Sequence, residues 1–271
     1  MITNRTYGMD NDVISYNARI VAGGNQSLSM QSLRQLNQFV ISIKKMKLWY
    51  NMVCWPLRAN QNAGTGLIAY SLGGLTTQNG TLTNGPIWAN NGIVFDGTND
   101  YITISNFTTS FLGTLFYSAN HLSMTSDSPT PTSQKAMNFY GIEIGKAEGA
   151  SFGVEATVLT PPYPTAGRST TISGFGAGIQ YTAAGVFNPA ASSMARFYNG
   201  ASKDLNSSAT YPAVSTSLTT NIGTRSFSSI NSAFNGTISI AIYFNSALSD
   251  ADIASIHFFY KTTLGQDLAL P

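Results

Sequence analysis

Two glutamates five positions apart form the arrangement in this sequence that comes closest to acid–base chemistry. Glu143 and Glu148 bound the segment Glu-Ile-Gly-Lys-Ala-Glu, which follows an apolar run and reads as part of a strand. Alternate strand residues share one face, and a β-bulge can return the second glutamate to the face of the first. Two carboxyls roughly 5–5.5 Å apart, one of them protonated, carry out retaining glycoside hydrolysis. The two glutamates therefore make glycoside hydrolysis one hypothesis. The alternative is that the segment is only an exposed strand end and turn.

A second group of residues has the chemistry for sugar binding. Sugars are held by an aromatic ring against their apolar face and by polar side chains that fix their hydroxyls. Because the chain has 13 tyrosines, such sets also arise without function. The residues of this kind that fall in or near expected loops are our candidate ligand-binding residues: Tyr163, Arg168, Tyr181, Asn188 and Tyr198.

Metal ligands are sparse. His121 has no histidine or cysteine at zinc-binding spacing, and His257 lies beside two phenylalanines on an expected helix, where packing is the expected role. Asp96 and Asp100 could bind calcium, which prefers carboxylate and carbonyl oxygens. Capping of a turn is the role we expect for both side chains. We therefore predict no metal and no cofactor, with calcium at the two aspartates as the alternative.

The composition limits the partners. Charged residues are only 10% of the 271 residues and the formal net charge is +2, so there is no electrostatic basis for binding nucleic acid or an anionic membrane. No run approaches the ~18 apolar residues of a membrane-spanning helix. The first residues lack an apolar signal core, and we expect no export by a standard signal. Cys54 is the single cysteine, which excludes an internal disulfide and indicates a buried thiol.

Two helices are predicted before the β-rich part of the chain. Apolar residues recur at helical spacing over 12–22 and again over 29–47, where Ser29 is a suitable N-cap and lysines occupy the last turns. A dense apolar cluster follows and is expected to pack the helical unit onto the β domain. We predict that residues 1–55 form an arm and a helical anchoring region, with these assembly residues: Leu33, Leu36, Phe39, Trp49 and Trp55.

Strands are predicted after this region. Residues 92–104 read as an apolar strand, an Asp-Gly turn and a second strand from Tyr101, which is the pattern of a hairpin. Residues 234–244 form a long β run. Residues 249–259 then have the N-cap, Ser249, and the apolar spacing of a helix.

These two stretches resemble the opening and closing motifs of concanavalin A-like, laminin-G-type jelly-roll domains. The opening resemblance rests on Ile-Val-Phe-Asp-Gly at 93–97, and the closing one on Phe-x-Gly-x-Ile from Phe234, followed by Ala-Leu-Ser and a helix. The motifs lie about 140 positions apart, a fitting length for one domain. The resemblance implies a mainly β fold, a single concanavalin A-like β-sandwich over 56–271 with a short N-terminal helical region and a short C-terminal helix. Phe95 and Phe234 are expected to share its core.

The same resemblance bears on hydrolysis. Glycosidases of this fold family carry a Glu-x-Asp-x-x-Glu strand. Residues 143–148 are similar to it in both glutamates but have Gly145 in place of the aspartate and Lys146 where an apolar residue belongs. Without this aspartate, the chain lacks the group that would keep one of the two glutamates protonated. We predict that the protein is not an enzyme, with a glycoside hydrolase as the second alternative.

The order of the elements resembles a layout that recurs in tailed-phage virion proteins. A helix ends in Leu-Trp at 48–49, a Met and a Pro-Leu follow, and a polar linker leads into the Phe-Asp-Gly turn. The resemblance implies a structural protein located in the virion, a head decoration or a tail or fibre component. Its partners would be other virion proteins or further copies of itself, with no nucleic acid and no membrane. The alternative is a carbohydrate-binding host-receptor adhesin, whose partner would be a host surface glycan.

Overall fold

The computed structural model describes most of the chain from residue 8 onward. It covers residues 8–105, 107, 110–122, 134–139, 142–146, 153–159, 165–168, 172–173, 177–211, 220–226, 230–231 and 233–271. In the strands between 134 and 173, side chains are described at positions 136–138, 142–145 and 156. None of the helices in the described residues is long and apolar enough to cross a membrane.

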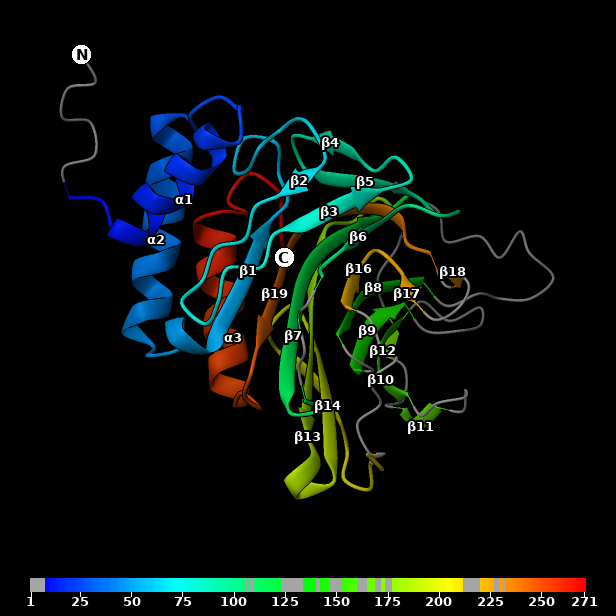
Figure 1. Cartoon of the computed structure of the whole chain (residues 1–271). Coiled ribbons are helices and arrows are strands. Elements are labelled where there is room, and N and C mark those ends of the chain that lie inside the picture. Colours follow the sequence, from blue (N-terminus) through cyan, green and yellow to red (C-terminus); the bar gives the residue numbers. More distant parts are fainter. Residues whose placement is uncertain are drawn as a thin grey trace, which may run out of the picture.

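Three layers make up the protein (Figure 1): helices, a helix-covered sheet and an outer sheet. The helix-covered sheet has the spatial order β15 (Ser202–Asn206), β14 (Ser193–Tyr198), β13 (Tyr181–Asn188), β7 (Gly113–His121), β19 (Asn235–Phe244), β5 (Gly92–Asp96) and β4 (Ile87–Ala89), with β1 (Met52–Pro56) also on β19. The outer sheet has the order β11 (Thr165–Arg168), β10 (Gly153–Leu159), β9 (Ile142–Lys146), β8 (Gln134–Phe139), β16 (Thr220–Ile222), β6 (Tyr101–Thr103), β3 (Gly80–Thr83) and β2 (Ile68–Ala69), with β12 (Ile172–Ser173) on β10. A small hairpin, β17 (Arg225–Ser226) and β18 (Ile230–Asn231), follows β16.

The helices begin where the sequence predicts them. They are α1 (Asn11–Ala22), α2 (Met30–Lys45) and α3 (Asp250–Thr262), with short 3₁₀ turns η1 (Trp49–Asn51) and η2 (Pro189–Ala191). Ser29 caps α2 by accepting a hydrogen bond from the amide of Ser32. Ser249 and Asp252 form a capping box at the start of α3, which satisfies backbone amides that the first helical turn leaves unpaired.

Strand β19 lies at the centre of the helix-covered sheet and is buried on both faces. It pairs with β7, β5 and β1. Ile238, Ala241 and Tyr243 belong to the core between the two sheets. Ile240 and Ile242 belong to the core between this sheet and the helices. A strand buried on both faces reads as a continuous apolar run, which is the pattern of residues 240–244.

The turn at Asp96 to Asp100 carries the chain from one sheet to the other. Strand β5 pairs with β4 and β19 in the helix-covered sheet, whereas β6 pairs with β3 and β16 in the outer sheet. The prediction that these two strands form a hairpin is therefore wrong. The prediction that both ends of the domain share one core is confirmed, because Phe95 and Phe234 lie in the same core with ring centroids 6.1 Å apart.

The helical region is part of the same body as the sandwich. The predicted boundary between residues 55 and 56 falls inside β1, and α2 and α3 cover the outer face of the β1–β19 pair. The side chains predicted to contact other proteins are buried within their own chain, at no more than 4% exposure: Leu33, Leu36, Phe39, Trp49 and Trp55. Their assignment to assembly is corrected, because they are already occupied in packing the helices and strands of this chain.

A buried guanidinium ties the C-terminal tail to the sandwich. Arg58 is 2% exposed and donates from Nη1 and Nη2 to the two carboxylate oxygens of Asp267, both at 2.6 Å. Its Nη1 also donates to the carbonyl of Leu264 and its Nε to the carbonyl of Asn90, each at 2.7 Å. Segments far apart in sequence therefore meet on one side chain.

We expect Asp267→Ala to destabilise the protein by about 2 kcal/mol, because it leaves a buried guanidinium without its anion while the other donors stay bonded. Urea unfolding followed by tryptophan fluorescence measures the change. Gln266→Ala is the control, since Gln266 is the exposed neighbour of Asp267. Equal unfolding midpoints for the two variants would show that the ion pair contributes nothing.

Candidate functional site

A row of polar side chains crosses the outer sheet on the face that points away from the core. In β9, Ile142 and Ile144 lie in the core between the sheets, so Glu143 points to the opposite face. Glu143 is opposite Asn138 of β8, and Asn138 is opposite Asn221 of β16. The register then continues the row through Thr103 of β6 to Thr81 of β3.

The middle of this row is closed to solvent. Glu143 is fully buried, and Asn138 and Asn221 are each 1% exposed. Among the side chains described on this face, Glu143 is the one carboxylate, and Gly145 on the same face has no side chain to offer. Glu148, the predicted second carboxylate, lies outside the described residues. The described row therefore supplies one of the two carboxyls that retaining hydrolysis requires.

The described members of the predicted sugar-binding set do not form an exposed platform. Tyr181 begins β13 and its side chain is fully buried, which corrects the expectation of a tyrosine in a loop. Tyr198 ends β14, half-buried, with its ring centroid 5.8 Å from that of Tyr181. Asn188 caps η2 through its side-chain oxygen. Tyr163 lies outside the described residues, and the structure describes Arg168 only as a backbone position in β11.

Tyr181 belongs to a buried cluster that includes a histidine. Its hydroxyl lies 2.8 Å from Nε2 of His121 and 3.1 Å from the hydroxyl of Tyr117, and all three residues are fully buried. The rings of His121 and Tyr181 are nearly parallel, with centroids 5.8 Å apart. Burial raises the pKa of Tyr181 well above its ordinary value, which keeps the hydroxyl protonated as a hydrogen-bond partner. These groups hold the core together.

Asp96 and Asp100, the calcium alternative, serve the turn between the sheets. Asp96 Oδ1 accepts from the amides of Thr98 at 2.7 Å and Asn99 at 3.2 Å, and Asp100 Oδ2 accepts from the amide of Asp96 at 3.1 Å. Partial burial opposes ionisation of Asp96, but the backbone donors outweigh it and lower its pKa. These bonds are the capping role that we predicted. No group of three or more His, Cys, Asp or Glu that could hold a metal occurs among the described residues.

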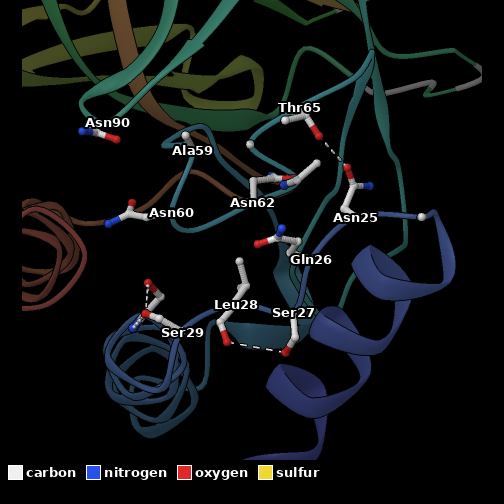
Figure 2. A pocket seen from close by; sticks show the side chains of 14 residues that line it. Asn25, Gln26, Ser27, Leu28, Ser29, Ala59, Asn60, Asn62, Thr65 and Asn90 are labelled. Atoms are coloured by element: carbon white, nitrogen blue, oxygen red, sulfur yellow. Dashed lines mark hydrogen bonds between the residues drawn. The ribbon is translucent and has the colours of Figure 1, made fainter.

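A pocket of about 700 Å³ lies where the helices meet the sandwich (Figure 2). Its walls come from the loop between α1 and α2, the loop after β1 and the turn between β4 and β5. The lining side chains are amides, hydroxyls and small or aliphatic groups, and none is ionisable: Asn25, Gln26, Ser27, Leu28, Ser29, Ser32, Ala59, Asn60, Asn62, Ala63, Thr65 and Asn90, with Gly24 and Gly64. Its volume is in the usual range of small-molecule sites.

Sequence reasoning missed this pocket. Residues 60–66 read as a turn-rich connector, and 23–24 as the glycine end of a helix. Asn and Gly are the usual residues of turns, so their presence gave no signal of a site. Only the folded chain brings Gln26, Asn60 and Asn90 to one hollow (Figure 2).

Comparison with known proteins shows the fold. No protein-family model matches the chain, and no curated protein is similar to it. A mutant of HCR/D has a similar structure over 78% of this chain and 52% of that chain, with 10% identity and a TM-score of 0.54. A Trypanosoma rangeli sialidase in complex with 2,3-difluoro-KDN is similar over 87% of this chain, with 11% identity and a TM-score of 0.52. The chain spans only 40% of that sialidase.

These structural similarities confirm the predicted fold class. Because the sequence identities are so low, the similarities show the fold and nothing beyond it. The protein is a mainly β sandwich of two antiparallel sheets with N-terminal helices and a C-terminal helix. Domain 4 of AbnA, an extracellular arabinanase from Geobacillus stearothermophilus, in complex with arabinotriose, is also similar, over 76% of this chain and 87% of that chain. Its identity is 15%, and its TM-score of 0.44 is too low to carry an argument.

His257 packs α3 onto the sheet, as predicted. Its Nδ1 lies 2.7 Å from the hydroxyl of Thr182 in β13. Burial and then the nearby charge of Lys261 lower the pKa of His257. The unfolded chain therefore takes up this proton at a higher pH than the folded chain, so the contribution of neutral His257 is complete above about pH 6.5 and falls as the pH drops below that value.

We expect His257→Gln, which keeps a hydrogen-bonding side chain, to make stability less dependent on pH between about pH 5 and 8. Because the group is half-exposed, the difference should be below about 1 kcal/mol. Urea unfolding of both proteins at several pH values measures it. Parallel pH profiles for wild type and variant would contradict this assignment.

Proposed function

We propose that the protein is a non-enzymatic structural component of a tailed-phage virion, a head decoration or a tail or fibre component, that displays a lectin-like sandwich. The proposal is supported by the neutral composition, with 10% charged residues. The order of elements also supports it, since helices α1 and α2, strand β1, the linker and the Asp-Gly turn follow one another as in the phage proteins that the sequence resembles. In this role its partners are other virion proteins or further copies of itself.

The observation that carries the structural role is an exposed apolar edge. Strands β2 and β4 are the outermost strands of the two sheets on the same side of the sandwich. Leu67 and Ile87 there are 64% and 67% exposed, and Ile68 is 36% exposed. The indole of Trp88 donates to the carbonyl of Gly66 at 3.0 Å, which joins the two edges. Open strand edges with apolar side chains favour contact with another protein.

The non-enzymatic part of the proposal rests on Glu143. This carboxylate is fully buried, and its register neighbour Asn138 is neutral. A hydrolase needs an acid and a second carboxylate that both reach the substrate. A buried carboxylate beside a carboxamide favours a structural role.

Purified virions of the phage that carries this gene are expected to contain the protein in their mass spectrum. The double variant Leu67→Ser, Ile87→Ser should be incorporated at lower copy number while its melting temperature stays unchanged, because both side chains are exposed. Leu122→Ser is the matched control, since Leu122 is 59% exposed and directly follows β7, on neither edge strand. Virions that lack the protein would refute the structural role.

The alternative, a glycoside hydrolase, predicts that Glu143→Gln abolishes an activity of the wild type. The non-enzymatic proposal predicts that there is no activity to lose. We expect the wild-type protein and Glu143→Gln to release no reducing sugar from a panel of neutral and acidic polysaccharides, beside a commercial glycosidase as positive control. Turnover by the wild type that disappears in a correctly folded Glu143→Gln protein would establish a hydrolase and end the non-enzymatic proposal.

The second candidate function, a carbohydrate-binding host-receptor adhesin, is favoured by the uncharged pocket at the helix–sandwich junction rather than by the predicted tyrosines. It is compatible with a place in the virion, since a displayed structural protein can also bind a host glycan.

A further inference from the structure

The amides of the pocket divide into those that hold its walls and those that are free. Asn62 is 1% exposed and donates from Nδ2 to the carbonyls of Pro56 at 2.6 Å and Tyr70 at 2.9 Å. Its Oδ1 accepts from the amides of Ala63 at 2.8 Å and Tyr70 at 3.0 Å. These four hydrogen bonds of the Asn62 side chain fix the loop after β1, so Asn62 holds the wall of the pocket in place.

The opposite wall is held in the same way. Asn17 of α1 accepts from the amide of Leu28 at 2.9 Å. The Thr65 hydroxyl donates to Oδ1 of Asn25 at 3.1 Å and joins the two loops (Figure 2). The turn that carries Asn90 is held through its carbonyl by Arg58. The pocket is therefore shaped before any ligand arrives, which lowers the entropic cost of binding.

Three carboxamides remain free. The side chains of Gln26, Asn60 and Asn90 are exposed and make no hydrogen bond to another described residue. They come from three different segments and border one hollow (Figure 2). Each carboxamide offers two N–H donors and one carbonyl acceptor. Groups that both donate and accept match a hydroxyl group, which also does both.

We infer that this pocket binds an uncharged polyhydroxylated ligand, a short segment of a neutral saccharide. Charged ligands do not fit, because no lining residue is ionisable and a charge moved out of water needs an opposite charge or several strong donors. This inference rests on the second candidate function, the carbohydrate-binding adhesin, and supplies its binding site, but it does not depend on the structural role in the virion.

A peptide ligand fits less well. Peptides are usually held by pairing with a strand edge or by apolar side chains in deep apolar pockets. The lining segments are loops and the start of a helix, and their apolar members are small or already covered: Leu28 is 9% exposed, and the others are Ala59 and Ala63. Because the lining has no aromatic ring, a single site should bind a saccharide weakly.

The test uses the full chain in isothermal titration and saturation-transfer NMR. The probes are neutral oligosaccharides (glucans, mannans, galactans and N-acetylhexosamine oligomers), sialylated and sulfated counterparts, and a library of uncharged peptides. The triple variant Gln26→Ala, Asn60→Ala, Asn90→Ala removes the free amides. Its matched control removes three exposed amides elsewhere: Gln38→Ala, Asn99→Ala, Asn245→Ala. Asn60→Trp fills the hollow at an exposed position, so it preserves the fold.

We expect at least one neutral oligosaccharide to bind, with the triple variant and Asn60→Trp weakening it about tenfold or more and the control leaving it unchanged. Melting temperatures confirm that all variants are folded. The inference is overturned if no neutral saccharide binds, if the triple variant binds like the wild type, or if only peptides or anionic glycans bind through these residues. None of these outcomes changes whether virions contain the protein, so the two proposals can fail separately.

Discussion

The whole structure depends on a central sheet that is apolar on both faces. Strand β19 sends Ile238, Ala241 and Tyr243 into one core and Ile240 and Ile242 into the other. Fully burying one isoleucine side chain contributes roughly 1.5–3 kcal/mol, so neither face can be left to water. A second sheet covers one face and helices cover the other, and the order of three layers follows from that single requirement.

This requirement explains why the N-terminal helices belong to the sandwich. Without α2 and α3, the outward face of β19 and β1 would be exposed to solvent. Under α3, the Thr182 hydroxyl and the His257 ring pair with each other, because a buried polar group without a partner is costly. The same rule applies to Arg58, whose buried guanidinium is paired with the carboxylate of Asp267 and with two backbone carbonyls. Burial of this charge is tolerated only with these partners, and they tie the C-terminal tail to the sandwich.

The sequence was informative where one local pattern allows one structure. Ser29 and Ser249 cap helices as predicted, and the long β run predicted at 234–244 became the central strand. It was misleading where two structures share a pattern. The Asp-Gly turn after Phe95 has the same chemistry whether the next strand pairs with the previous one or crosses to the other sheet. Likewise, an amphipathic helix looks the same whether its apolar face packs within its own chain or on another protein.

The pocket could not be predicted for a related reason. Its free amides are separated by tens of residues, and each lies in a segment whose local sequence reads as an ordinary turn. What brings them together is the framework: Arg58 holds the carbonyl of Asn90, and Asn62 fixes the loop that presents Asn60. Arg58, which also fastens the C-terminal tail, and the bond from Thr65 to Asn25, which joins the helical layer to the sandwich, thus help to shape the hollow. A chain whose layers separated at this junction would lose the pocket with its stability, which makes the junction the place where fold and binding are coupled.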